Sequence, residues 1–138
     1  MVKIVINTGS GFYLTHKAVM RYAELTKMKL TGYLHDHTRH WYKKYNSSDK
    51  KEEWTEQFLD YYVDTDLDII AENDHLIENF FPLFLDRTDP SLIQVVEELK
   101  DTEQLELKIV EVPEDVKWKI EEYEMGPECV REISRVWK

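Results

Sequence analysis

Hydrophobic positions switch between strand-like and helix-like spacing along the first part of the chain. The apolar run at residues 3–6 ends at Asn-Thr-Gly-Ser-Gly, which predicts a buried strand that enters a glycine turn. Apolar side chains at near-helical spacing follow Thr15, which is a suitable N-cap, and they predict a helix through Leu25. The run at 30–34 predicts a second strand.

The middle of the chain is richer in aromatic and charged side chains. Residues 36–48 are polar and aromatic without a clear period. Residues 49–62 predict a helix, because one helical stripe would collect four aromatic residues, Trp54, Phe58, Tyr61 and Tyr62. Residues 64–70 alternate acidic and apolar side chains, which predicts a half-exposed strand.

The last part of the chain contains one strong helix signal. An apolar stretch at 80–85 runs into a charged turn, where Thr88 or Asp89 can cap a helix that starts at Pro90 and continues to Leu99. Residues 105–112 and 116–123 alternate as an antiparallel hairpin, with 113–115 as its turn. Helical spacing of apolar residues after Pro127 predicts a tail helix with Arg131 and Arg135 on one face.

These elements together predict a single α+β domain over residues 1–138. It has a short N-terminal strand and helix, a helical middle insertion, and a C-terminal helix followed by the antiparallel hairpin and the tail. The length of 138 residues suits one domain that builds a core without disulfide or metal support.

Charge is distributed unevenly along the chain. The formal net charge is −10, but residues 1–63 carry ten Lys or Arg and seven Asp or Glu, whereas 64–138 carry eight and twenty-one. The acidic total argues against a general DNA or RNA coat and leaves room for a local basic pocket. The asymmetry fits an anionic ligand near the first half, and it fits equally a dimer that pairs opposite charges.

Targeting and redox signals are few. The single Cys129 excludes an internal disulfide framework and agrees with a reduced cytosolic setting. The first seven residues turn polar too soon for a secretion signal or a membrane span.

Familiar catalytic and metal motifs are incomplete here. Gly9-Ser10-Gly11 lacks the rest of any phosphate loop, so a tight turn is favoured over anion binding. Asp64-x-Asp66-x-Asp68 lacks the glycine and glutamate of a calcium loop. The spacing of His35, His37 and His40 matches no strong zinc motif, so a basic and aromatic surface loop is favoured. We expect no cofactor and no catalytic residues.

Two stretches combine cations with flat apolar side chains, as nucleotide binding requires. Residues 39–45 contain Trp41 among four basic or histidine side chains, and 81–89 join Phe81 to Arg87 at a helix start that itself favours anions. Each stretch also has a plain structural interpretation. The first can be a solvated loop, and the second can be core phenylalanines before a capped turn in which Arg87 pairs with an aspartate.

Several motifs resemble a group of small phage proteins. They are the opening Lys-Ile-Val-Ile-Asn at 3–7, the glycine turn that ends in Phe12, the run 16–25, Arg87-Thr88-Asp89-Pro90 with 94–99, the run 107–113, Trp118 with 120–123, and the closing Arg-Val-Trp at 135–137. The resemblance is to the phage anti-Thoeris proteins and covers more than half of the chain, with 36–79 as a family-variable insertion. It implies a sponge that binds cyclic ADP-ribose isomers made by bacterial TIR-domain defence enzymes without cleaving them.

The resemblance also implies where and how binding takes place. Relatives bind at subunit interfaces of a dimer or larger homo-oligomer, in the cytoplasm of the infected bacterium, and some are thought to hold cyclic oligonucleotides. Recurrent family motifs include Phe12, Arg21, Arg87, Thr88 and Asp89, whereas Trp41 and Phe81 rest on chemistry alone. Residues 100–106 lack the glycine-rich loop of relatives, and 123–127 replace an aspartate-glycine turn, so no phosphate contact is carried over to either loop.

The resulting hypothesis is a sponge for a cyclic nucleotide, with no membrane and no nucleic-acid polymer as partner. Arg87 is the first candidate for phosphate, Thr88 and Asp89 for ribose hydroxyls or the helix N-terminus, and Phe81 for base stacking. Arg131 and Arg135 are lesser candidates for anion contact. The alternative is an acidic protein that inhibits a host enzyme by covering a basic surface. A third hypothesis, an enzyme that cleaves the same nucleotide, has less support because no catalytic motif is present.

Overall fold

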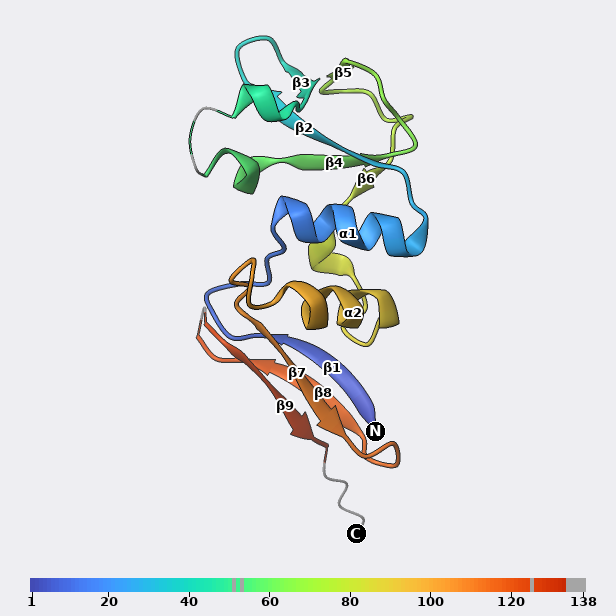
Figure 1. Ribbon diagram of the computed structural model, residues 1–138, viewed down its shortest axis with the longest axis vertical. Coiled ribbons are helices and arrows are strands. Elements are labelled where there is room, and N and C mark those ends of the chain that lie inside the picture. Colours follow the sequence, from blue (N-terminus) through green and yellow to red (C-terminus); the bar gives the residue numbers. More distant parts are fainter. Residues whose placement is uncertain (51, 53, 125, 134–138) are drawn as a thin grey trace. The chain divides into compact units, whose positions relative to one another are not determined.

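The computed structural model describes residues 1–50, 52, 54–124 and 126–133, and it is mostly β (Figure 1). Within those residues there are nine strands and two α-helices. In chain order they are β1 (Val2–Asn7), α1 (His16–Thr26), β2 (Leu30–Asp36), β3 (Trp41–Lys44), β4 (Asp60–Val63), β5 (Ile69–Ala71), β6 (Asn79–Phe80), α2 (Pro90–Leu99), β7 (Leu107–Val112), β8 (Trp118–Glu122) and β9 (Glu128–Glu132). They form two compact units: the central unit, residues 15–82, and the terminal unit, residues 1–14 with 83–138. The prediction of one folding domain stays a prediction.

The central unit contains a five-stranded antiparallel sheet in the order β5-β3-β2-β4-β6. Tyr33, Tyr62 and Ile70 are buried together, and Tyr42 and Ile77 pack against them. The Tyr33 hydroxyl donates to the Leu67 carbonyl at 2.7 Å, so this buried ring keeps a partner for its polar end. Burial raises the pKa of Tyr62 to about 12, so its hydroxyl stays neutral in the core.

The predicted helix after Thr15 is confirmed as α1. The Thr15 hydroxyl accepts a hydrogen bond from the Ala18 N–H at 3.3 Å, which satisfies one of the donors that a helix start leaves open. Its buried side chains repeat at helical spacing and are Ala18, Val19, Tyr22 and Ala23. The Tyr22 ring stacks on Phe80 of β6 with ring centroids 5.8 Å apart, so the apolar stripe of α1 lies against the sheet.

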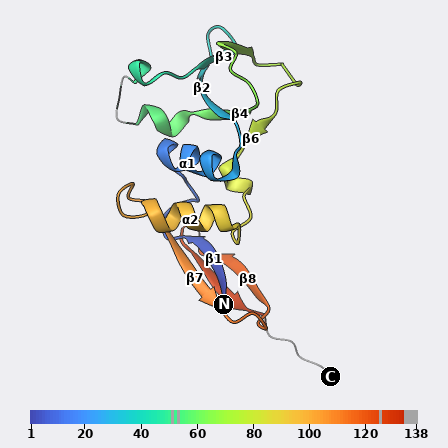
Figure 2. The ribbon, with the colours of Figure 1, turned by 45° about the vertical axis from the view of Figure 1, so that its right-hand side comes forward.

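The terminal unit joins the two ends of the chain. β1 pairs antiparallel with β7, from Val2 opposite Val112 to Asn7 opposite Leu107, and β8 pairs with β9. The predicted helix from Pro90 to Leu99 is confirmed as α2, and the Asp89 carboxylate caps it by accepting from the Ser91 N–H at 2.8 Å. α2 packs on β1 and β7 (Figure 2), and its side chains Leu92, Val95 and Val96 are fully buried.

The predicted α+β class with a helical middle insertion is wrong, because the middle of the chain forms most of the five-stranded sheet. In place of the helix predicted at 49–62, the structure has a 3₁₀ helix at Thr55–Phe58 followed by strand β4, and another 3₁₀ helix, Ser47–Asp49, ends where the predicted helix would begin. Tyr61 and Tyr62 are adjacent and both are buried, 6% and 4% exposed. Adjacent strand residues point to opposite faces, so two buried neighbours indicate a strand that is covered on both sides. Of the half-exposed strand predicted at 64–70, only the last two residues are in a strand, β5.

The C-terminal strands also pair differently from the prediction. The prediction of a hairpin between 105–112 and 116–123 is wrong, because β7 pairs with β1 and β8 pairs with β9. The expected tail helix is likewise wrong over the described residues, because Glu128–Glu132 is strand β9. Over so short a run, the spacing of Cys129 and Val130 between charged residues does not distinguish a strand from a helix.

His16 gives the central unit a pH dependence that can be measured. Its ring hydrogen-bonds with the Tyr61 hydroxyl at 2.9 Å, and burial lowers its pKa from 6.5 despite the opposing effect of Glu56. The unfolded chain therefore takes up the proton first, so we expect this residue to reduce stability as the pH falls below 6.5. Melting temperatures of the wild type and of His16→Gln, from about pH 7.5 to about pH 5.5, measure the effect.

The matched control for this experiment is His75→Gln, at an exposed histidine. We expect His16→Gln to flatten the pH profile and His75→Gln to leave it unchanged. Equal slopes in the wild type and in His16→Gln would contradict the assignment.

Candidate functional site

Arg87, the first candidate for a phosphate contact, is bound by protein groups in the terminal unit. Its guanidinium donates to both carboxylate oxygens of Glu128, at 2.6 and 3.2 Å, and its side chain is only 15% exposed. Its carbon Cζ lies 4.2 Å from the centroid of the Phe12 ring, which gives a cation–π contact. Burial raises the pKa of the Glu128 carboxyl, but hydrogen bonds from Arg87 and the Asn7 N–H outweigh it, so the pKa is lower than 4.5.

The glycine turn after β1 is held from inside by Asn7. The buried Asn7 side chain accepts from the Gly9 N–H at 2.8 Å and donates to the Gly9 carbonyl at 3.3 Å. The Glu106 carboxylate lies where a Cβ on Gly9 would be. A side chain at position 9 would therefore displace the exposed Glu106 side chain, and this neighbouring carboxylate disfavours an anion on the backbone of the turn.

The other candidates in the terminal unit have structural partners. The Thr88 hydroxyl and N–H both donate to the Asp86 carboxylate, which lowers the Asp86 pKa, and Asp89 caps α2. Arg131 on β9 pairs with Glu121 on β8. Arg135 lies outside the described residues.

The central unit holds the remaining three candidates, at separate places. Arg21 on α1 lies 3.6 Å from the Glu24 carboxylate, and Phe81 follows β6 and is half exposed. The Trp41 ring on β3 lies 5.5 Å from the Arg39 guanidinium carbon. Among the buried side-chain polar atoms of the described residues, the Trp41 indole N–H alone has no hydrogen-bond partner. Within the terminal unit the structure therefore brings Arg87 and Phe12 together, beside Thr88 and Asp89.

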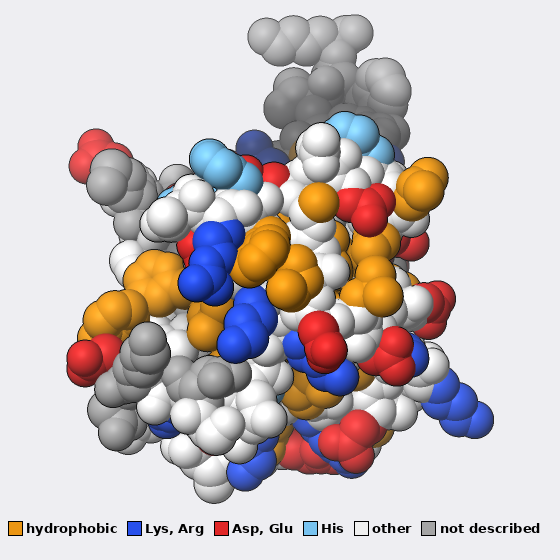
Figure 3. Space-filling view, turned by 90° about the horizontal axis from the view of Figure 1, so that it is seen from above, with side chains coloured by type: hydrophobic (Ala, Val, Ile, Leu, Met, Phe, Trp, Pro, Cys, Tyr) orange, Lys and Arg blue, Asp and Glu red, His pale blue; other side chains and the backbone are white. Residues whose placement is uncertain are grey.

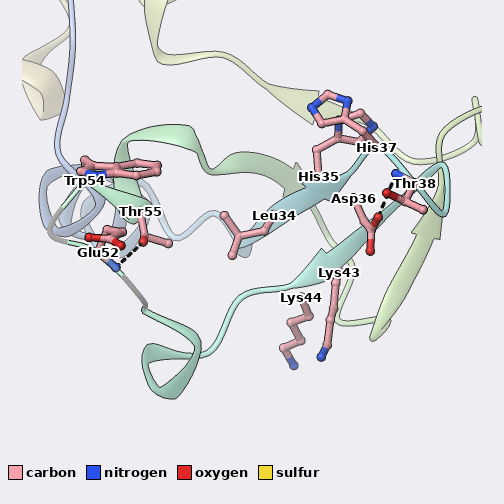
Figure 4. Close-up of a pocket in the computed structure, with 10 residues that line it drawn as sticks. All are labelled: Leu34, His35, Asp36, His37, Thr38, Lys43, Lys44, Glu52, Trp54 and Thr55. Atoms are coloured by element: carbon pink, nitrogen blue, oxygen red, sulfur yellow. Dashed lines mark hydrogen bonds between the residues drawn. The ribbon is translucent and has the colours of Figure 1, made fainter.

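A hollow of about 660 Å³ lies on the central unit beside the β2–β3 hairpin (Figure 4). In the figure the Leu34 side chain lies between the residues 35–38, at the end of β2 and the start of the hairpin turn, and Trp54. Lys43 and Lys44 extend from β3 to one side. Its lining residues come from β2, the hairpin turn, β3 and the chain ahead of β4, and are Leu34, His35, Asp36, His37, Thr38, Lys43, Lys44, Glu52, Trp54 and Thr55.

The cations and the aromatic ring of this hollow suit a phosphorylated planar ligand. Lys43 and Lys44 are both exposed, so their ammonium groups are hydrated point charges that can bind phosphate oxygens at little desolvation cost. Trp54 is 54% exposed and meets only one ring, Phe58, edge-on at 5.4 Å among the ring contacts of the described residues. An indole face left open to solvent can stack on a base.

Two carboxylates give the hollow a second kind of contact. The Asp36 carboxylate accepts from the N–H groups of Arg39 and Thr38, both at 3.0 Å, and these bonds, with the Arg39 bond the larger cause, lower its pKa. Asp36 is therefore ionised at neutral pH, and Glu52 lines the opposite part of the hollow. Ionised carboxylates accept hydrogen bonds from ribose hydroxyls and from exocyclic amino groups, so the donor and acceptor set matches a nucleotide better than a simple anion.

A second hollow of about 350 Å³ shares both lysines with the first. It is lined by Lys43, Lys44, Tyr45, Asn46 and Asp68. Figure 3 shows Lys and Arg side chains beside hydrophobic ones on one face of the molecule. The shared lysines place positive charge between two hollows, so a ligand with more than one anionic group has room on either side of them.

The histidines of the hairpin are organised by one carboxylate. One carboxylate oxygen of Glu72 pairs with His35, and the other lies 3.1 Å from Nδ1 of His40. Both interactions hold the pKa of the Glu72 carboxyl below its usual range, and the interaction with His35 has the larger effect. The His35 and His37 rings meet edge-on at 4.1 Å. Over the described part of the chain, no three His, Cys, Asp or Glu side chains are arranged to hold a metal ion.

Sequence reasoning identified part of this hollow and missed the rest. Lys43 and Lys44 belong to the basic and aromatic stretch at 39–45, whereas the spacing of aromatic residues predicts Trp54 to lie in a helical stripe, away from any site. Glu52, Trp54 and Thr55 come close to the hairpin only through tertiary folding, which no local sequence pattern predicts.

No protein-family model, curated protein or solved structure matches this chain. Neither α-helix of the described residues has the length and apolar character needed to cross a membrane.

The ion pair of Arg87 and Glu128 leads to a stability prediction. Replacement of one partner leaves the other charge largely buried and unpaired, so we expect Arg87→Ala to lower the free energy of unfolding by about 3 kcal/mol, and Arg87→Lys by less. Because the folded-state pKa of Glu128 lies below 4.5, this contribution is present above that pH and is lost as the pH falls through the folded value.

Urea unfolding of the wild type, Arg87→Ala and Glu128→Gln at about pH 7 and about pH 3.5 measures both effects. We expect the difference between wild type and Arg87→Ala to shrink at the lower pH. A difference that is equally large at both values would argue against the pair as its source.

Proposed function

We propose that the chain binds and sequesters a small cyclic nucleotide, of the cyclic ADP-ribose type or a cyclic oligonucleotide, without cleaving it. The carrying observation is the hollow beside the β2–β3 hairpin, which combines two exposed lysines, an exposed indole and two carboxylates. These groups supply counter-charge for phosphate, a stacking face for a base and acceptors for hydroxyl or amino groups.

The resemblance to phage anti-Thoeris proteins supports the same class of ligand. It suggests that the bound nucleotide is a defence signal of the infected bacterium and that the protein works as a homo-oligomer. The motif residues Arg87, Thr88, Asp89 and Phe12 have structural partners in the terminal unit, so we assign the first contacts with the nucleotide to Lys43, Lys44 and Trp54.

Thermal unfolding with a panel of ligands tests the proposal. The panel contains cyclic ADP-ribose isomers and cyclic di- and trinucleotides, because a ligand in excess over its dissociation constant stabilises the folded state. Chromatography of the ligand after heat release then separates the outcomes. Stabilisation with intact ligand supports sequestration, altered ligand points to an enzyme, and no stabilisation by any member overturns the proposal.

Substitutions in the hollow predict where the ligand lies. We expect Lys43→Ala and Lys44→Ala each to weaken binding about tenfold, equivalent to about 1.4 kcal/mol for one lost charge-assisted contact. We expect Trp54→Ala to weaken it by about tenfold or more and Trp54→Phe by less, because phenylalanine keeps a stacking face. Isothermal titration calorimetry with the stabilising ligand measures each affinity.

Lys108→Ala is the matched control, since it removes the same charge at an exposed position on β7 of the terminal unit. Its affinity should equal that of the wild type. If the ligand stabilises the protein but the three alanine variants of the hollow bind it normally, the hollow is not the site although the function can stand.

A further inference from the structure

The segment 64–78 of the central unit, which we call the acidic strip, exposes aliphatic side chains among carboxylates. It contains six Asp or Glu residues and no Lys or Arg: Asp64, Asp66, Asp68, Glu72, Asp74 and Glu78. Leu67 is 51% exposed, Ile69 is 43% exposed and Leu76 is 97% exposed. Single exposed aliphatic residues are ordinary, but three within one strongly charged segment form a surface that suits a partner.

A hollow of about 300 Å³ opens in this strip. Leu67, Leu76 and Ile77 contribute aliphatic walls, and Asp64 and Glu78 add carboxylates to the same lining. A Lys or Arg side chain fits such a place, since its methylene stem packs on apolar groups while its charged end reaches the acidic rim. The carboxylates of Asp66 and Glu72 already have basic neighbours in Lys29, His35 and His40.

The strip also supplies a strand edge. β5 is the outermost strand on its side of the sheet. The backbone carbonyl of Asp68 accepts from the Lys44 N–H at 2.8 Å, and the backbone N–H of Glu72 donates to the His40 carbonyl at 3.2 Å. The backbone groups of the even-numbered residues therefore point toward β3. Alternation along an antiparallel strand then turns the backbone groups of Ile69 and Ala71 away from β3, where another strand can pair with them.

Charge decides which strand fits this edge. A second copy of β5 would bring Asp68 and Glu72 of both chains close together, and like charges across a strand pair are destabilising. A cationic strand would instead place positive side chains opposite these carboxylates, which stabilises the pairing. Short charged edges also discourage aggregation, but that role alone does not account for an almost fully exposed Leu76 beside an aliphatic hollow.

We propose that the acidic strip docks an extended, cationic and aliphatic segment of a partner protein. That segment adds a strand to β5 and places one Lys or Arg side chain in the hollow between Leu67 and Leu76. No residue of the acidic strip lines the hollow of about 660 Å³ to which the nucleotide is assigned, so this proposal stands whether or not the chain binds a nucleotide.

A pair of synthetic peptides tests the proposal with the full-length chain. One fluorescent peptide of about seven residues alternates Lys with Val, and its partner replaces every Val by Ser, so that the charge is the same. Binding is measured by fluorescence anisotropy at about 0.15 M salt, because this salt screens the general attraction between a cationic peptide and a chain of net charge −10. We expect the Lys-Val peptide to bind about tenfold more tightly. Equal binding of the two peptides would overturn the proposal.

Two variants locate the contact without changing the charge. Leu76→Ser removes an exposed side chain and should weaken binding of the Lys-Val peptide about fivefold, with Leu83→Ser, at an exposed leucine of the terminal unit, as the control. Ile69→Pro removes one N–H that points away from β3 and should weaken binding similarly. Normal binding by both variants would overturn the site.

Hydrogen exchange separates strand addition from simple charge attraction. The Lys-Val peptide should slow exchange of the Ile69 and Ala71 amides, and the Lys-Ser peptide should leave them unchanged. Unprotected amides in the presence of saturating Lys-Val peptide would overturn the added strand.

Discussion

The ion pair between Arg87 and Glu128 is the interaction on which the terminal unit depends. It joins the turn before α2 to β9, while the Val5 N–H donates to the Arg87 carbonyl and the Asn7 N–H donates to Glu128, both at 2.8 Å, so β1 is held as well. Taking two charges out of water is costly, and the attraction compensates only when the remaining donors and acceptors are also bonded. The bidentate geometry and these backbone bonds meet that condition, and they explain why a charged pair can sit where the two chain ends meet.

This structural use of Arg87 shifts the chemistry of binding to the central unit. The Arg87 guanidinium is paired with the Glu128 carboxylate, packed on Phe12 and only 15% exposed, so a phosphate could meet it only beside that carboxylate, and like-charge repulsion adds a cost to binding. The exposed ammonium groups of Lys43 and Lys44 carry no such cost. Arginine is well suited both to phosphate binding and to an interior ion pair, so the residue type alone does not distinguish the two roles.

Local signals predicted the helices, and long-range pairing decided the rest. Thr15 and Asp89 each cap a helix through a bond to a residue two or three positions away, so both helix starts could be predicted from sequence. The partner of β1 is about 100 residues distant, with Val2 opposite Val112, and no local pattern encodes that choice. The spacing of Trp54 and Phe58 imitates a helix stripe, whereas the adjacent buried Tyr61 and Tyr62 were the signal for a strand covered on both faces. The lysines of the hollow were therefore predictable, and its tryptophan was not.

The sheet of the central unit carries surfaces of opposite sign side by side. β3 brings Lys43 and Lys44, and its neighbour β5 lies within the acidic strip, with the Lys44 N–H bonded to the Asp68 carbonyl. Exposed charges interact over about 8 Å at physiological salt, so a ligand responds to the groups it meets and hardly to the total of the chain. A net charge of −10 therefore argues against a long nucleic-acid partner, which would span both surfaces, but it does not argue against a nucleotide at the lysines or a cationic segment at the strip. Each surface has to be judged by its own residues.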